Sequence, residues 1–218
     1  MIDMWRAYFQ NPTAFFGFVE LEPWIGMGPS LAAFRRGQLA SLSLPHVGYA
    51  IGTDIGDPTG PFGSIHPRNK KLVGKRLAAA ALSITYGIPT PYLPPTYNSA
   101  RSTAKGQLLT VTVLFDEVPT KLVSAADHCK TEAPFKVPVA ECAWFSITTS
   151  DNSILNATAT IGADGKSLVL TATAAKAGIT ATGSSFGMNG WPINTIMSAE
   201  GLPLQPWSEN ITTALGFM

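Results

Sequence analysis

The stretch Asp54–Lys70, DIGDPTGPFGSIHPRNK, begins as an irregular loop and ends inside a helical pattern. Its glycines and prolines interrupt any regular strand or helix as far as Pro67. From Pro67 to Tyr86 apolar residues recur at three- and four-residue steps, which predicts a helix. Ser64 is the expected N-cap of that helix and Gly87 the expected stop signal.

The loop places His66 directly before the predicted helix, with Asp54 and Asp57 a short way upstream. A neutral imidazole is a good general base, and a nearby carboxylate can fix its tautomer and stabilise its protonated form. We therefore treat His66, Asp54 and Asp57 as candidate catalytic residues. The alternative is structural: His66 caps its own helix and the aspartates make turns.

The residues before this loop predict alternating strands and helices. A short helix is expected over 2–10, and Phe34 is among the residues expected to face the sheet from a second helix, Ser30–Ser43. Phe15–Leu21 and His46–Thr53 are apolar runs of the kind found in buried parallel strands. This order predicts βαβ units, whose ligands bind beyond the carboxyl ends of the strands.

After Ile88 the pattern changes, so we expect an α/β domain over 1–88 and a β-rich domain over 89–218. A proline-rich connector comes first, and strand signals then follow at Gln107–Phe115, Lys121–Ser124, Trp144–Thr149, Ile154–Ile161 and Ser167–Ala174. Short strands separated by turn residues predict an antiparallel β-sandwich-like domain. Trp191 and Trp207 are expected to pack in a core or lid rather than to stack on a sugar.

Composition restricts the functional classes. The 218 residues are 45% hydrophobic and 13% charged, with a net charge of +1, which fits a folded β- and loop-rich extracellular protein. The basic residues gather only on the Pro67–Tyr86 helix, where a solvated face is the simpler explanation than nucleic-acid binding. The N-terminus resembles neither a signal peptide nor a membrane span, so no membrane partner is predicted.

The two cysteines, Cys129 and Cys142, show no metal-binding spacing, and we predict neither a metal nor a cofactor. They could instead form a disulfide. Sequons at Asn156 and Asn210 would fit a secreted or lysosomal protein. Because such a protein needs a signal that the chain does not show, we expect the sequence to begin inside a longer protein.

The runs WRAYF, FGFVELEPW, LAAFRRGQLASLSLPHVGYAIGTDIGD and GSIHPRNKKLVGKRLAAAAL resemble the C-terminal portion of the sialate O-acetylesterases. The resemblance implies a partial SGNH-hydrolase-like, three-layer α/β unit in which His66 matches the catalytic histidine. Many relatives place the triad aspartate three residues earlier, where this chain has Gly63. Asp54 or Asp57 would then supply the carboxylate. Glu20 stands where the family has glutamine.

A serine esterase also needs a nucleophile and an oxyanion hole. The chain contains neither a GQSN-type block nor GxSxG; Ser64 is explained as a cap, and Ser184 and Ser185 belong to the β-rich half. We therefore expect a missing N-terminal serine-bearing segment as partner, and exposed apolar surface on or near Phe15–Leu21. The expected function is removal of O-acetyl groups from sugars such as sialic acids. The alternatives are a non-catalytic glycan-binding or scaffold chain, and an acetyl-xylan esterase of the same fold.

Overall fold

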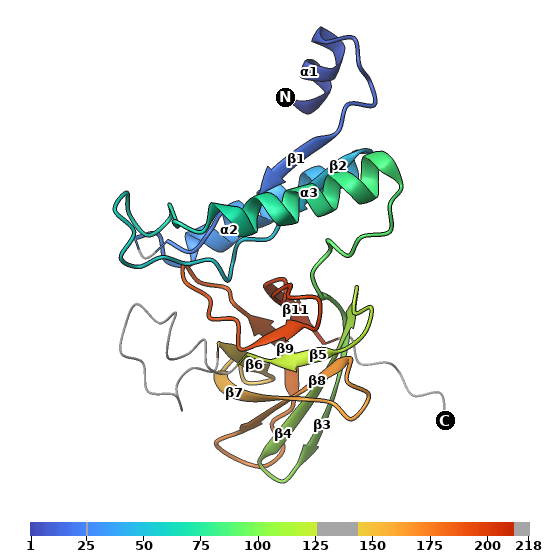
Figure 1. Cartoon of the computed structure of the whole chain (residues 1–218). Coiled ribbons are helices and arrows are strands. Elements are labelled where there is room, and N and C mark those ends of the chain that lie inside the picture. Colours follow the sequence, from blue (N-terminus) through green and yellow to red (C-terminus); the bar gives the residue numbers. More distant parts are fainter. Residues whose placement is uncertain (25, 126–143, 212–218) are drawn as a thin grey trace.

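The computed structural model describes residues 1–24, 26–125 and 144–211 (Figure 1). Its first part is a small α/β unit with a two-stranded parallel sheet, and α2 continues into a short 3-10 helix, Ala40–Ser43. The elements of this unit are α1 (Ile2–Tyr8), β1 (Phe16–Val19), α2 (Ser30–Leu39), β2 (Val47–Ala50) and α3 (Lys70–Tyr86). The predicted βαβ order is therefore present.

The long helix α3 lies across the parallel sheet, and glycines in the strands allow its close approach. A Cβ atom added to Gly48 would come within 2.7 Å of Ile84 and 3.1 Å of Ala80, both on α3. Every residue of β2 is buried, as its apolar run predicts. The carboxyl ends of β1 and β2 consequently meet at one edge of the sheet, where the Asp54–Lys70 loop begins.

Helix α3 begins later than the sequence predicts. Its N-cap is Asn69, whose side chain accepts a hydrogen bond from the Leu72 N–H, so the expectation of a Ser64 cap is wrong. The reason lies in the loop: the Asp57 carboxylate accepts the Arg68 backbone N–H at 3.1 Å, which holds the chain outside the helix. The predicted stop is confirmed, because Gly87 is left-handed with φ 65°.

The inward face of α2 also differs from the prediction. Leu31 is fully buried as expected, but Phe34 is 56% exposed. Arg35 is the residue that turns inward, donating to the carbonyl oxygens of Leu21 at 2.7 Å and Asn189 at 3.3 Å. Adjacent residues on a helix point about 100° apart, so a buried Arg35 leaves Phe34 facing solvent.

The second part is mostly one antiparallel sheet of seven strands in the order β11-β9-β6-β7-β8-β4-β3. Two short strands, β5 and β10, form a separate antiparallel pair. The strands are β3 (Thr96–Lys105), β4 (Leu108–Asp116), β5 (Leu122–Ser124), β6 (Phe145–Thr149), β7 (Ile154–Ile161), β8 (Ser167–Thr173), β9 (Ala181–Phe186), β10 (Ile196–Ser198) and β11 (Trp207–Asn210).

The large sheet folds over its own core, so that its two edges approach each other. Tyr97 of β3 and Trp207 of β11 lie with ring centroids 6.1 Å apart, and the Ser102 hydroxyl of β3 donates to the Ala181 carbonyl of β9 at 3.4 Å. The expectation of an antiparallel β-rich half is confirmed. The five predicted strand segments correspond to β4–β8, whereas β3 and β9–β11 are not predicted.

Several long-range contacts join the two parts. Trp24 donates its backbone N–H to the Gly190 carbonyl at 2.8 Å, and the Tyr49 hydroxyl donates to Gln205 Oε1 at 2.8 Å. Trp191 packs against Gly56, in the loop that follows β2. The loop bearing the candidate site is thus placed by both parts of the chain.

At the N-terminus, α1 projects away from the rest of the molecule (Figure 1). The helix and the residue on each side of it expose large apolar side chains: Met1, Met4, Trp5, Tyr8 and Phe9. Among the described residues, no helix has the length and apolar character needed to cross a membrane. Cys129, Cys142 and Thr212 of the second sequon lie outside the described residues.

Candidate active site

His66 lies exposed on the loop between β2 and α3. Its backbone N–H donates to the Gly63 carbonyl at 3.0 Å, and Gly63 has a φ of 91°, which suits glycine. Within the described ranges, no hydrogen bond joins the His66 ring to another side chain. The ring is therefore open to an incoming group, and the following residue, Pro67, is buried and anchors the turn.

Asp54 is buried and held by Arg76. Two parallel hydrogen bonds of 2.6 and 2.7 Å join the carboxylate to the guanidinium, and each side chain is only 5% exposed. Arg76 also donates to the carbonyls of Ile51 at 2.7 Å and Gly201 at 3.0 Å. Both Asp54 oxygens are thus engaged by a cation that also bridges the two parts of the chain.

Asp57 is paired with a different arginine, at the surface. One carboxylate oxygen accepts a hydrogen bond from Arg68 Nε at 2.7 Å, and the other accepts one from Arg68 Nη2 at 2.8 Å. The Arg68 side-chain and backbone hydrogen bonds lower the pKa of Asp57 to about 2. Asp57 is therefore ionised at neutral pH, and its charge is directed toward Arg68.

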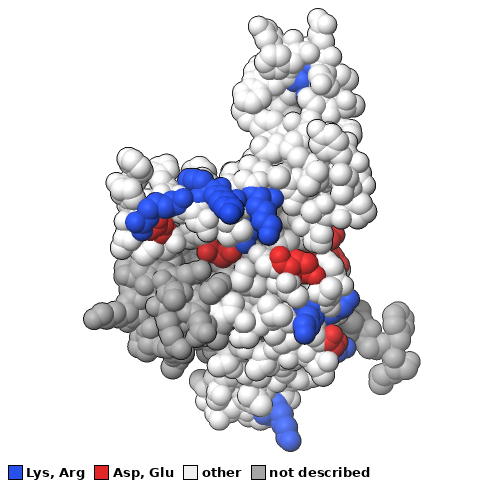
Figure 2. All heavy atoms as spheres, viewed as in Figure 1, with Lys and Arg blue, Asp and Glu red and all other residues white. Residues whose placement is uncertain are grey.

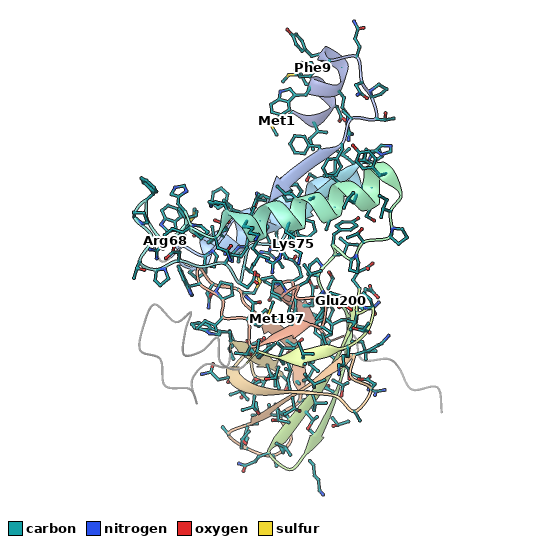
Figure 3. The ribbon with its side chains drawn as sticks, in the orientation of Figure 1. Met1, Phe9, Arg68, Lys75, Met197 and Glu200 are labelled. Carbon is teal, nitrogen blue, oxygen red and sulfur yellow. The ribbon has the colours of Figure 1, made fainter. Side chains whose placement is uncertain are left out.

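A groove of about 550 Å³ opens beside these residues. It is lined by Asp54, Ile55, Gly56, Asp57, Pro67, Arg68, Asn69, Leu72, Arg76, Met197 and Gly201. Figure 3 shows Arg68 near one end of α3, and Met197 and Glu200 below the helix in the β-rich part. The structure brings Asp54 and Asp57 to one groove, whereas His66 lies on the same loop outside its lining. A volume of this size suits a small ligand.

Glu22 is a carboxylate at the same edge that sequence reasoning missed. It follows β1, its side chain is 6% exposed, and its Oε2 accepts from Lys70 Nζ at 3.3 Å. Burial raises the pKa of Glu22, while the charges of Lys70 and then His66 oppose that rise. The signal available from sequence was its position, just beyond the carboxyl end of a predicted strand.

A second missed group is a buried polar chain under α2. Gln205 Nε2 donates to Glu20 Oε1 at 2.7 Å, and Tyr49 donates to the other end of the same amide. Glu20 is fully buried, and desolvation raises its pKa to about 7, although Gln205 and the charge of Arg35 act in the other direction. Burial also lowers the pKa of Arg35, to about 10. This row of hydrogen-bonded side chains links the end of β1, β2 and the segment before β11.

The serines and tryptophans considered from sequence have structural contacts. Ser184 is buried and accepts from Trp207 Nε1 at 3.2 Å, and the hydroxyls of Ser185 and Ser146 lie 2.6 Å apart. Trp191 and Trp207 are both buried, so their predicted packing role is confirmed. Neither ring presents a face for stacking on a sugar.

Basic side chains gather around the start of α3 (Figure 2). Exposed members of this group are Arg68, Lys70, Lys71 and Lys75. Acidic side chains lie next to them in the same view, in keeping with the Asp57–Arg68 and Glu22–Lys70 pairs. In the described part of the chain, no three His, Cys, Asp or Glu residues form a group that could hold a metal ion.

Known proteins similar to this chain fall in one group. No family model matches it. Human sialate O-acetylesterase is 39% identical over 103 residues, which are 40% of this chain and 20% of the relative. The mouse protein is 32% identical over 103 residues (40% and 19%), and the rat protein 35% over 81 residues (33% and 15%). The matches thus span no more than a fifth of the length of these relatives.

A solved structure extends the likeness to most of the chain. A carbohydrate acetylesterase from Xanthomonas citri superposes with a TM-score of 0.73 and 27% sequence identity, covering 96% of this chain and 44% of that protein. The sequence and structural matches agree with the resemblance seen in the sequence. In sequence and in fold, this chain is therefore similar to the sialate O-acetylesterases and to a carbohydrate acetylesterase.

Proposed function

We propose that this chain is the base-bearing part of a serine carbohydrate O-acetylesterase, most like those that deacetylate sialic acids. The observation that carries the proposal is the exposed His66, on a fixed loop beyond the carboxyl ends of β1 and β2, beside an open groove. The fold likeness to a carbohydrate acetylesterase supports it.

In the proposed reaction, His66 takes the proton of a serine hydroxyl as that oxygen attacks the acetyl carbonyl. The tetrahedral intermediate collapses, and the proton passes from the ring to the departing sugar oxygen. Water then releases acetate from the serine by the same two proton transfers. Asp54 or Asp57 would stabilise the protonated ring, although each is bonded to its own arginine in this structure.

The serine would come from a segment that this chain does not contain, and we propose that segment as its partner. Two features support a packed neighbour at the N-terminal end. The parallel sheet has only two strands, and α1 exposes Trp5 and Tyr8 to solvent. Burying these side chains against further α/β structure would extend the two-stranded sheet.

The test is turnover of an acetyl ester by the complete protein with His66→Ala. Loss of a triad base lowers kcat by about 10³-fold or more. His46→Asn is the matched control, since His46 is also exposed and its φ of 55° is one that asparagine tolerates. Turnover near wild type in His66→Ala would show the base assignment to be wrong.

Comparing O-acetylated sialic acid with acetylated xylan as substrates would separate sialate esterase from acetyl-xylan esterase activity. A non-catalytic glycan-binding role through Trp191 or Trp207 has less support, because both rings are buried.

We also propose passage through the secretory route, since Asn156 of the first sequon is exposed on β7. A glycosidase-sensitive mass shift that Asn156→Gln removes would support it, and the absence of any shift would count against it.

A further inference from the structure

Glu22 is a buried carboxylate beyond the end of β1, at the sheet edge where the Asp54–Lys70 loop begins. Its Cγ lies 2.8 Å from where a Cβ on Gly52 would stand, so the side chain fits between the ends of β1 and β2. Its partner Lys70 is the first residue of α3, four positions after His66. The Glu22 side chain is therefore tied to the start of α3, just after the turn that presents the imidazole.

The two oxygens of Glu22 differ. Oε2 accepts from Lys70, whereas Oε1 is buried without a hydrogen-bond partner among the described residues. A buried acceptor without a donor destabilises the folded state, because its lost contact with water is not replaced. Such a group is retained at functional sites more readily than in ordinary cores.

The other carboxylates at this edge are already engaged. Asp54 gives both oxygens to Arg76, and Asp57 gives both to Arg68. Of these three carboxylates, Glu22 alone keeps an oxygen without a donor in the described structure. The charge of His66 also favours the ionised form of Glu22, after the larger effect of Lys70.

We propose that Glu22 is a positioning residue for His66, a buried carboxylate that stabilises the ring when it holds the serine proton. The proposal rests on the function proposed above. The proton moves from serine to the imidazole and later to the sugar oxygen, and Glu22 stays ionised throughout. Lys70 holds one carboxylate oxygen in place and leaves the other for the imidazolium.

The first test needs only this chain, and it measures the pKa of the Glu22 carboxyl by carbon-13 NMR. His66→Ala removes a cation that favours ionised Glu22, so the pKa of Glu22 is expected to rise further. His46→Asn, at the other exposed histidine of the described part, is expected to leave it unchanged. A pKa of Glu22 that does not move in His66→Ala would overturn the proposal.

The second test uses the complete protein and deacetylation kinetics. Glu22→Gln is expected to lower kcat by roughly 10²-fold or more with little change in KM, and Glu22→Asp to recover part of the loss. Glu209→Gln, on exposed β11, is the control with unchanged kinetics. If folded Glu22→Gln keeps wild-type kcat, the role of Glu22 is refuted while that of His66 stands.

A different result would refute the esterase proposal itself. If His66→Ala leaves turnover unchanged, the base assignment is wrong whatever the Glu22 variants do. If Glu22→Gln does not fold, the NMR comparison still decides, because it alters only exposed histidines. The variant Asp57→Asn tests whether the Asp57 carboxylate stabilises the protonated ring of His66 instead. A larger loss of kcat in Asp57→Asn than in Glu22→Gln would overturn the Glu22 assignment.

Discussion

The ion pairs of Asp54 and Asp57 are close in sequence and very different in surroundings. Asp54 and Arg76 are each 5% exposed, and Arg76 also binds carbonyls from both parts of the chain. Arg68, the partner of Asp57, is 63% exposed. The buried pair joins two parts of the fold, whereas the surface pair shapes a loop. The position of a carboxylate in the sequence therefore does not predict its role. Its role depends on its burial and on what else its arginine partner binds.

Breaking the buried pair gives the largest expected effect. Arg76→Leu leaves Asp54 as an uncompensated buried charge, and we expect a loss of about 3–5 kcal/mol in the free energy of unfolding. Urea denaturation measures it. The double variant Asp54→Leu/Arg76→Leu should recover part of the loss, since no charge is then stranded. A loss below about 1 kcal/mol in the single variant would contradict the assigned role.

A second buried charge extends the comparison to pH. Glu20 has a pKa of about 7 in the folded chain, against 4.5 for the free side chain. Between these values the folded state binds more protons, so stability falls as pH rises from about 4.5 through 7. The expected change is on the order of 3 kcal/mol.

The measurement is urea denaturation at a series of pH values across that window. Glu20→Gln should flatten the profile, while Glu209→Gln, at an exposed position, should leave its slope unchanged. Equal slopes in Glu20→Gln and wild type would show that Glu20 does not titrate as described.

A neutral link at the same junction is expected to matter less. Tyr49→Phe keeps the stacked contact with Phe18 but leaves Gln205 Oε1 without its donor. The expected loss of stability is about 1–3 kcal/mol. Tyr8→Phe is the control, because Tyr8 is exposed and should tolerate the change. Thermal unfolding of the variants gives the comparison, and equal midpoints for Tyr49→Phe and wild type would exclude a contribution from this bond.

The surface pair should give the smallest change in stability. Arg68→Gln removes the main cause of the low pKa of Asp57, which should return toward 3.8 while the unfolding midpoint stays close to wild type. Because the pKa of Asp57 is lower in the folded state, the pair contributes its full stability only above pH 3.8. That contribution is lost as the pH falls through about 2. An NMR titration of the Asp57 carboxyl checks the shift. A large drop in stability would mean that this pair, too, is structural.

Much of the fold was predictable because it follows local patterns. The apolar periods of α3, β2 and β7 are visible in the sequence and appear in the structure. Strand β3 is not predicted because its Thr, Ser, Asn and Lys residues are polar and follow a proline-rich run. Its strand conformation is stabilised by hydrogen-bonded pairing with β4. The start of α3 was misplaced since one hydrogen bond from Arg68 to Asp57 decided it.

The candidate site was predictable only in part. The exposure of His66 follows from a loop rich in glycine and proline, and its position after β2 from the strand pattern. The arginine partners of Asp54 and Asp57 depend on packing that residue spacing does not encode. Glu22 and Glu20 were hidden because acidic residues at a strand end are usually solvated, and only the fold shows that both are covered.

The bonds at the junction also imply an order of assembly during synthesis. Arg76 reaches Gly201, Arg35 reaches Asn189 and Tyr49 reaches Gln205, across 125, 154 and 156 positions of the chain. On the ribosome the N-terminal residues emerge long before these partners. The His66 loop consequently gains this support only after residues 189–205 have been made, and contacts between such distant residues form slowly. A site built from such distant segments is therefore among the later features of the fold to form.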